Sequence, residues 1–246
     1  MRTRNLALAA AAALIATPAV ASAASFAGNG NTGFGGAIGT NTLNITDDGT
    51  NATISLDSPF AGNVLVLYLD NTAGGLADTA LLDDTDDGGR TATSGFNDND
   101  PALPDDDTRT LATFAPGFGA DTSVVIGEFG LVIFDLIENP GDGGLPFVFF
   151  VDDDANDFVF EVPLADLGIA PGGSFDFVGS LISETAFRSD ETIGAADFVL
   201  DADPNPGFTG SVTFTESLTY TSTVIPEPAS LGLLSVAGLG LLRRRK

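Results

Sequence analysis

Residues 64–70 read Val-Leu-Val-Leu-Tyr-Leu-Asp, and residues 147–151 read Phe-Val-Phe-Phe-Val. In both runs the odd and the even positions are apolar, and a strand with this pattern has both of its faces covered. We therefore expect residues 64–69 and 147–151 to form central strands of a sheet.

Other strand-like runs recur between turns rich in Gly, Asp and Asn, which is typical of an all-β protein. They are residues 42–46, 52–56, 123–126, 129–137, 158–162, 174–183 and 212–220. In the last run Thr and Ser alternate with apolar residues, except at Glu216, which predicts a strand with one wet face. We expect a single antiparallel β-sandwich, of the jelly-roll kind or a relative of it, with long acidic loops.

Two stretches depart from the strand pattern. Residues 164–167 predict one helical turn, which Gly168 would close. Residues 79–104 are rich in Asp, Gly, Asn and Pro, and they predict a long irregular loop. Long helix patterns are missing from this middle part of the chain.

The composition excludes several classes of chemistry. The chain has 246 residues, 43% of them hydrophobic, so it can bury a core in one domain. It has no His and no Cys, which excludes Ser-His-Asp and Cys-His triads and ordinary zinc sites. Residues 24–226 hold 33 acidic residues, three arginines and no lysine. A region with this excess of negative charge would repel nucleic acid, which is a polyanion. We therefore do not expect nucleic acid as a partner.

The N-terminal residues have the three parts of a secretory signal peptide. Arg2 and Arg4 give a charged start, and residues 6–15 form an apolar run of ten residues. A membrane span needs about 20 residues, so this run is too short. We expect signal peptidase to read Ala21 and Ala23 and to cut after Ala23. An N-terminal anchor helix is the alternative.

The C-terminal end has a second three-part pattern. It consists of Pro226, Glu227 and Pro228, then the mostly apolar residues 229–242, then Arg243, Arg244, Arg245 and Lys246. At about 1.5 Å per residue this helix would span roughly 21 Å, less than the hydrocarbon core of about 30 Å. We expect transient insertion in the inner membrane, with the basic cluster on the cytoplasmic side. An ordinary short anchor is the alternative.

This C-terminal pattern resembles the PEP-CTERM sorting signal, and the matching residues are Pro226, Glu227, Pro228, the apolar stretch and the terminal arginines. The resemblance implies recognition by an exosortase, cleavage near the two prolines, and delivery to the cell surface or extracellular matrix. Some ice-binding proteins carry such tails, so the tail indicates a route and not an activity. We expect a signal peptide at 1–23, an exported β-sandwich at 24–223 and a sorting tail at 224–246.

Three stretches of the middle part resemble the DOMON-like superfamily of β-sandwiches, which includes sugar-binding modules and haem-binding domains. They are residues 64–70, residues 118–121, and residues 161–168 followed by Pro-Gly-Gly at 171–173. Haem ligation in that family would use His or Met, and the mature chain has neither, so we do not expect haem. Sugar modules usually stack their ligand on aromatic side chains. Here Phe, or the two tyrosines Tyr68 and Tyr220, would have to take that role.

Aspartates cluster in several loops, and one cluster is a candidate calcium site. Calcium takes about six to eight oxygen ligands, and an Asp-x-Asp-x-Asn loop can direct alternate side chains to one ion. Our candidate ligands are Asp152, Asp154, Asn156 and Asp157, which connect two hydrophobic strands. The EF-hand pattern is incomplete, because Asp157 stands where that loop requires Gly. Solvated acidic loops without an ordered ion are the alternative.

These observations lead to a main hypothesis and three alternatives. The main hypothesis is a noncatalytic exported protein of the cell surface or matrix, processed by signal peptidase and an exosortase. The first alternative is a carbohydrate-binding module for matrix polysaccharide, and calcium could assist this binding. The second is a glycoside hydrolase, which needs only paired carboxylates. The third is ice binding, which a regular array of threonines would support.

Overall fold

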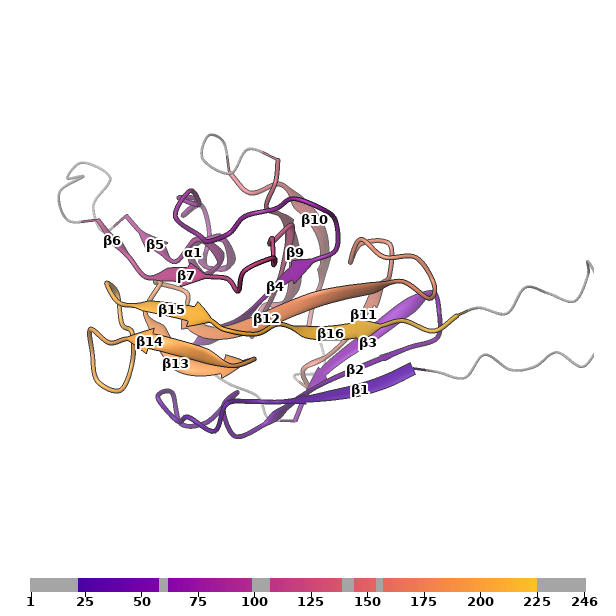
Figure 1. Ribbon diagram of the computed structural model, residues 1–246, viewed down its shortest axis with the longest axis horizontal. Helices are drawn as coiled ribbons and strands as arrows, with labels where there is room; N and C mark the ends of the chain where they lie inside the picture. Colours follow the sequence, from indigo (N-terminus) through magenta and orange to yellow (C-terminus); the bar gives the residue numbers. More distant parts are fainter. Residues whose placement is uncertain (1–21, 58–61, 99–106, 139–143, 154–156, 225–246) are drawn as a thin grey trace, which may run out of the picture.

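A computed structural model describes residues 22–57, 62–98, 107–138, 144–153 and 157–224. These residues are mostly β-strands, with one short helix among them (Figure 1). The elements are β1 (Ser22–Ala27), β2 (Thr42–Asp47), β3 (Asn51–Leu56), β4 (Asn63–Asp70), α1 (Gly88–Ser94), β5 (Phe96–Asn97), β6 (Thr108–Arg109), β7 (Leu111–Thr113), β8 (Thr122–Gly127), β9 (Gly130–Asp135), β10 (Phe147–Val151), β11 (Val159–Pro163), β12 (Ser174–Ser183), β13 (Arg188–Ile193), β14 (Ala196–Val199), β15 (Ser211–Phe214) and β16 (Leu218–Thr221). Across the described ranges, no helix has the length and apolar character needed to cross a membrane.

Two antiparallel sheets form the centre of the molecule. The smaller sheet has the strand order β1-β2-β3-β11. The larger has the order β10-β9-β8-β4-β12-β13, and β16 pairs with the first half of β12. Leu43, Ile54 and Phe160 of the smaller sheet share one buried core with Leu67 and Phe177 of the larger sheet. The predicted all-β antiparallel fold is therefore confirmed.

The opposite face of the larger sheet is buried as well. Val66 and Tyr68 of β4 belong to a second core, together with Ala92 of α1 and with Val212 and Phe214 of β15. Helix α1 and strands β7, β14 and β15 thus add a third layer (Figure 1). Within it β7 and β15 form a parallel pair. A sheet covered on both faces favours strands that are apolar at odd and even positions, which is the pattern of residues 64–69.

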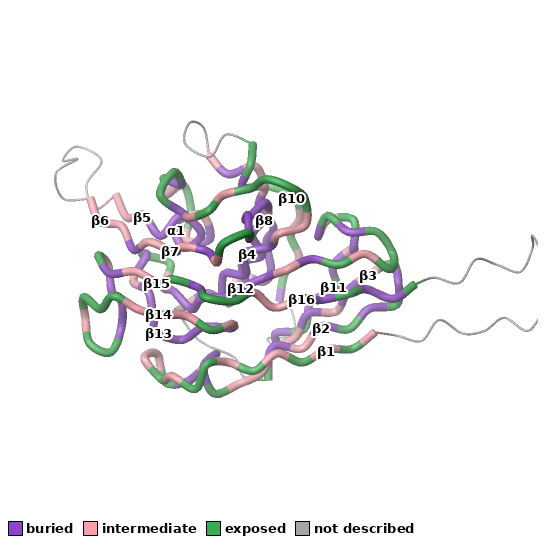
Figure 2. Tube along the Cα trace, viewed as in Figure 1, coloured by how far each residue is buried: buried purple, intermediate pink, exposed green. Residues whose placement is uncertain are grey.

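The two runs expected to be central strands differ in their position. Strand β4 lies between β8 and β12, and residues 64–69 are buried, as predicted. Strand β10 instead lies at the edge of the larger sheet, and Phe147 and Phe150 are 56% and 46% exposed. Figure 2 shows β10 in the colours of intermediate and exposed residues, whereas β4 is largely buried. The prediction for residues 147–151 was wrong, because an apolar outer face can also line a pocket.

The run at residues 212–220 is two strands and not one. Strand β15 lies in the third layer, whereas β16 pairs with β12 in the larger sheet. Glu216, at which the alternation slips, is exposed in the connection between them. The slip in the pattern therefore marks the point where the chain changes layers.

Residues 79–104, expected to be an irregular loop, contain α1. The helix begins after Asp87, whose carboxylate accepts a hydrogen bond from the backbone N–H of Arg90. It ends at Gly95, whose φ of 62° suits glycine in a left-handed cap. These end signals outweigh the weak helix propensity of the sequence GGRTATS. The predicted turn at 164–167 is present, and Gly168 closes it.

Strand β13 was not predicted, because its sequence RSDETI is almost entirely polar, yet all six residues are buried. Glu191 in this strand is fully buried, and its carboxylate accepts four backbone N–H groups from one loop. They are those of Phe34 at 2.6 Å and Gly36 at 2.9 Å on Oε1, and those of Ile38 at 2.8 Å and Gly39 at 3.0 Å on Oε2. Hydrogen bonds to the ionised form offset the loss of its hydration.

Replacing Glu191 with Gln should destabilise the fold. The amide of Gln keeps one acceptor oxygen, and its NH2 group would face backbone N–H donors that then lose their partner. At about 1–3 kcal/mol for each buried unsatisfied group, we expect the free energy of unfolding to fall by about 2–5 kcal/mol. Denaturant titration measures this change. The control Glu216→Gln, at an exposed residue, should change it by less than about 0.5 kcal/mol, and equal small effects would contradict the role of Glu191.

Candidate functional site

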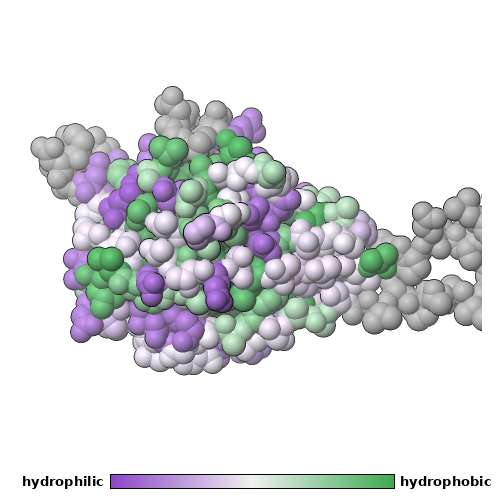
Figure 3. Space-filling model, in the orientation of Figure 1, coloured by the Kyte–Doolittle hydropathy of each residue, from purple (hydrophilic) through white to green (hydrophobic). Residues whose placement is uncertain are grey.

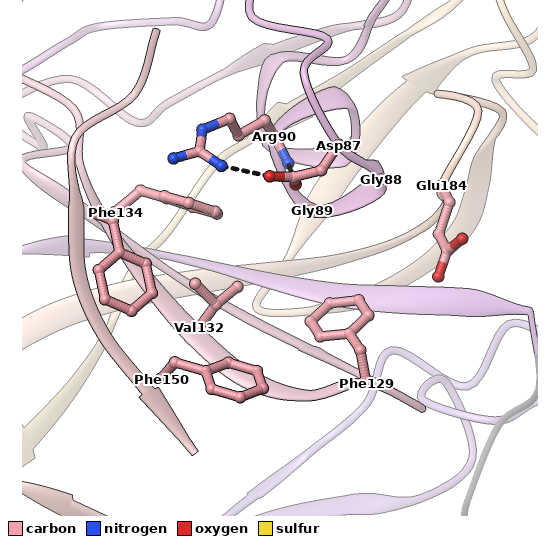
Figure 4. Close-up of a pocket in the computed structure, with 10 residues that line it drawn as sticks. Asp87, Gly88, Gly89, Arg90, Phe129, Val132, Phe134, Phe150 and Glu184 are labelled. Carbon is pink, nitrogen blue, oxygen red and sulfur yellow. Dashed lines mark hydrogen bonds and ion pairs between the residues drawn. The ribbon is translucent and has the colours of Figure 1, made fainter. Parts of the chain in front are cut away.

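The candidate site is a hollow of about 530 Å³ on the outer face of the larger sheet, where β9 and β10 meet the start of α1 (Figure 4). Its apolar lining consists of Phe129, Val132, Phe134, Phe147 and Phe150. Its polar side consists of Asp87 and Arg90 at the start of α1 and Glu184 after β12. In Figure 4, Phe129, Val132 and Phe150 lie on one side of the space, and Asp87 and Arg90 lie across from them.

A β-bulge in β10 builds the aromatic part of this hollow. Phe147 pairs with Phe134 of β9, whereas Phe149 pairs with Ile133, so Val148 is the extra residue. In a regular strand residues 147 and 149 would share a face. Because of the bulge, Phe147 and Phe150 line the hollow, and Phe149 instead packs against the core between the two sheets.

Arg90 holds α1 against this face of the sheet. Its Nε lies 3.1 Å from the Asp84 carboxylate, and its Nη1 pairs with the Asp87 carboxylate. Nε and Nη2 also donate to the carbonyl of Leu145, at 3.2 and 3.0 Å. The guanidinium carbon lies 4.7 Å from the centre of the Phe134 ring, which is a cation–π contact. Arg90 therefore lines the hollow in a fixed position, because several partners hold its guanidinium group at once.

Gly88 allows the start of α1 to approach Glu184, and Gly89 faces the sheet. A Cβ atom on Gly88 would lie 2.8 Å from the Glu184 Cβ, closer than side-chain atoms approach. A Cβ on Gly89 would lie 3.6 Å from both Phe134 and Val132, in ordinary contact. Glu184 is exposed at the rim, so its carboxylate is available to a ligand. The hollow thus offers apolar rings on one side and carboxylates at its rim.

Apolar side chains also occur elsewhere on the surface of the protein. On the face drawn in Figure 3, apolar side chains form small separate patches among polar ones, which is ordinary for a protein surface. In the hollow, four phenylalanines and a valine gather in one place. Sequence reasoning did not select these residues, because the faces to which Phe147 and Phe150 point depend on the bulge in β10.

The predicted calcium site is only partly within the described residues. Asp154 and Asn156 lie outside them. Asp152 is exposed, and the buried residue of this run is Asp153, whose carboxylate accepts the N–H of Asp157 at 3.2 Å. Within the part of the chain that the structure describes, no group of three or more acidic side chains is placed to hold a metal ion. The calcium site therefore stays a prediction.

The threonines between residues 212 and 220 do not form a regular array. Thr213 lies on β15 and Thr219 on β16, which belong to different sheets. Thr219 also donates a hydrogen bond to the Asp176 carboxylate at 2.6 Å. The feature that would have supported ice binding is therefore absent from this stretch.

The predicted processing residues lie at or beyond the two ends of the part of the chain that the structure describes. Ala23 is in β1 and pairs with Thr46, so β1 begins before the predicted cut. The predicted C-terminal helix at 229–242 and several processing residues lie outside the described residues. Those processing residues are Ala21, Pro226, Glu227, Pro228, Arg243, Arg244 and Arg245.

Replacing Arg90 with Met should loosen α1 while the two-sheet core remains folded. The change removes the ion pairs, the hydrogen bonds to Leu145 and the contact with Phe134, at a cost of about 1–2 kcal/mol. Hydrogen exchange should then become faster at the α1 amides and stay slow in β4. Arg90→Lys, which keeps the charge but not the forked donors, should give an intermediate effect. Unchanged exchange in α1 would contradict this role.

Comparison with known proteins identifies the C-terminal end. Residues 224–246 match the family described as the PEP-CTERM protein-sorting motif. Neither a curated protein nor a solved structure matches the chain. The resemblance to DOMON-like domains, and the choice between that topology and a jelly roll, therefore stay predictions. The chain therefore carries a PEP-CTERM sorting motif at residues 224–246, and this motif indicates sorting by an exosortase to the cell surface or the extracellular space.

Proposed function

We propose that this protein is a noncatalytic β-sandwich that works at the cell surface or in the extracellular matrix. The sorting motif at residues 224–246 is the observation that carries this proposal. Signal peptidase would process the N-terminal end, and an exosortase would release the chain from a transient inner-membrane tether. The sequence supports a noncatalytic role, because the lack of His and Cys excludes Ser-His-Asp and Cys-His triads and ordinary zinc sites.

The position of the chain ends supports display of the body away from the membrane. β1 begins and β16 ends at the same end of the molecule (Figure 1). There the backbone N–H of Ser22 donates to Thr223 Oγ1 at 2.6 Å. A tether that starts at Val224 would hold this end near the membrane. The hollow between β10 and α1 would then remain open to the surroundings.

The role of the tail in processing can be tested with a deletion and a matched pair of substitutions. Deleting residues 226–246 should abolish tail processing and surface delivery. Glu227→Gln alters the motif itself and should reduce processing, because the exosortase would read this side chain between the two prolines. Glu216→Gln makes the same chemical change outside the motif and should leave processing unchanged. Intact mass and cell fractionation measure the outcome, and normal processing of the deletion variant would reject the proposal.

The hollow favours a second candidate function, which is binding of a matrix polysaccharide. Its volume of about 530 Å³ lies within the range of about 300–1,000 Å³ that is typical of ligand pockets. The exposed rings of Phe147 and Phe150 can stack on the apolar face of a sugar ring. The carboxylates of Asp87 and Glu184 can accept hydrogen bonds from its hydroxyl groups.

The negative charge of the protein indicates which class of polysaccharide the hollow could bind. Residues 24–226 carry 33 acidic residues and three arginines, and Arg90 in the hollow is already paired with Asp84 and Asp87. An acidic polysaccharide would therefore be repelled, whereas a neutral or cationic one would not. We propose a neutral or amino-sugar polymer as the ligand.

Phe150→Ala should weaken binding of such a glycan at least tenfold, which corresponds to about 1.4 kcal/mol. The reason is the loss of one stacking surface at the edge strand, where truncation leaves the core intact. Val199→Ala, at a residue that is 64% exposed on β14, is the matched control and should not change affinity. Calorimetry with neutral, cationic and uronic-acid polysaccharides, each with calcium and with a chelator, measures both effects. Absence of binding in every condition would contradict this function.

A further inference from the structure

Asp121 is a carboxylate directly before β8, and it is only 3% exposed. Its two oxygens have different surroundings. Oδ2 accepts the backbone N–H of Asn71 at 2.9 Å and that of Thr72 at 2.8 Å. Oδ1 is buried without a hydrogen-bond partner among the described residues. A carboxylate oxygen that loses its water without gaining a donor is unfavourable, so Oδ1 is a candidate ligand for a cation.

A second oxygen borders the same small space, beside Gly75. A Cβ atom on Gly75 would lie 2.4 Å from the Gly119 carbonyl oxygen and 2.8 Å from Asp121 Oδ1. Such distances are too short for a carbon atom, but calcium binds oxygen at about 2.3–2.6 Å. Gly75 has a φ of 76°, which disfavours residues with a side chain. An ion would lie farther from the Gly75 backbone than this Cβ, between the two oxygens.

The negative charge around Asp121 also favours a cation. Asp70, at the end of β4, accepts the N–H of Gly119 at 3.0 Å, and Asp176 of β12 lies opposite Asp70 in the sheet. Burial raises the pKa of the Asp70 carboxyl, and the charges of Asp121 and Asp176 add to the rise. None of the ion pairs among the described residues involves these three carboxylates. A cation beside Asp121 would reduce their mutual repulsion.

We propose that a calcium ion binds beside Asp121, with Asp121 Oδ1 and the Gly119 carbonyl oxygen as protein ligands and with water in the remaining positions. Calcium accepts carboxylate, carbonyl and water oxygens in a flexible geometry. Gly74 and Gly75 are exposed, so water can reach this place. With few protein ligands, we expect a Kd on the order of 10⁻⁴–10⁻³ M, as in extracellular calcium modules. This site is separate from the aspartates at residues 152–157, and the inference does not depend on glycan binding.

The variant Asp121→Asn separates calcium binding from folding. Its amide oxygen can take the place of Oδ2 and accept the N–H groups of Asn71 and Thr72. Its NH2 group then takes the place of Oδ1, where it is a donor and no longer a ligand for calcium. Without calcium we expect the Tm of this variant to lie within about 3 °C of the wild-type value. Addition of calcium should not raise it.

The wild-type protein and a matched control complete this test. In the purified full-length protein, about 10 mM calcium should raise the Tm by about 4 °C or more relative to a chelator, because calcium would bind only the folded state. Asp197→Asn makes the same chemical change at an exposed residue of β14 and should keep this rise. An equal rise in Asp121→Asn would overturn the inference, because screening or another site would then explain it. Absence of a rise in the wild-type protein would overturn it as well.

Two measurements on the wild-type protein do not require the variant to fold. Calorimetry should show binding of calcium that is about tenfold tighter than that of magnesium, which demands a near-octahedral site and gives up its water reluctantly. Equal affinities would indicate general attraction to the acidic surface and would overturn the inference. A crystal structure with calcium should place the ion at about 2.3–2.6 Å from Asp121 Oδ1. Calcium bound elsewhere, with none beside Asp121, would also overturn it.

Discussion

Glu191, Asp121, Asp47 and Asp153 are buried carboxylates that bind backbone N–H groups in place of basic side chains. Each accepts at least two such groups, and the donors come from a loop or from a chain end. With no lysine and three arginines in the body, the chain has few other donors that could satisfy a buried carboxylate. The hydrogen bonds to these carboxylates therefore also attach the loops to the sheets, although Asp121 Oδ1 is buried without a hydrogen-bond partner among the described residues. Glu191 attaches residues 34–39 to β13, and Asp121 attaches residues 71 and 72 to β8.

The candidate site follows from the way the larger sheet is covered. Its central strands are buried on both faces, by the smaller sheet on one side and by α1, β7 and β15 on the other. The third layer does not cover the edge, so β10 leaves Phe147 and Phe150 exposed beside the start of α1. Arg90 fixes that boundary through Asp84, Asp87 and the Phe134 ring. The exposed rings at this edge are the feature on which the proposed binding of a sugar ring rests.

The limits of prediction from the sequence can be seen in three segments. The pattern of β4 identified a central strand, because burial on both faces favours apolar residues at odd and even positions alike. The same reasoning failed for β10, since a bulge and an edge position also accommodate such a run. β13 escaped notice because its polar residues are satisfied by a loop about 150 positions away in the chain. No local pattern encodes that partnership.

The sequence by itself determined the all-β class, the lack of histidine and thiol chemistry, and the sorting motif at residues 224–246. These properties are compositional or linear, so they do not depend on which strands are neighbours. Only the tertiary structure decided which strand lies at the edge, which phenylalanines share a face, and which carboxylates are buried beside backbone donors. Some of those properties depend on strand register, because side-chain direction in a sheet reverses with every shift of one residue. Others depend on contacts between residues that are distant in the sequence, such as Ser22 with Thr223.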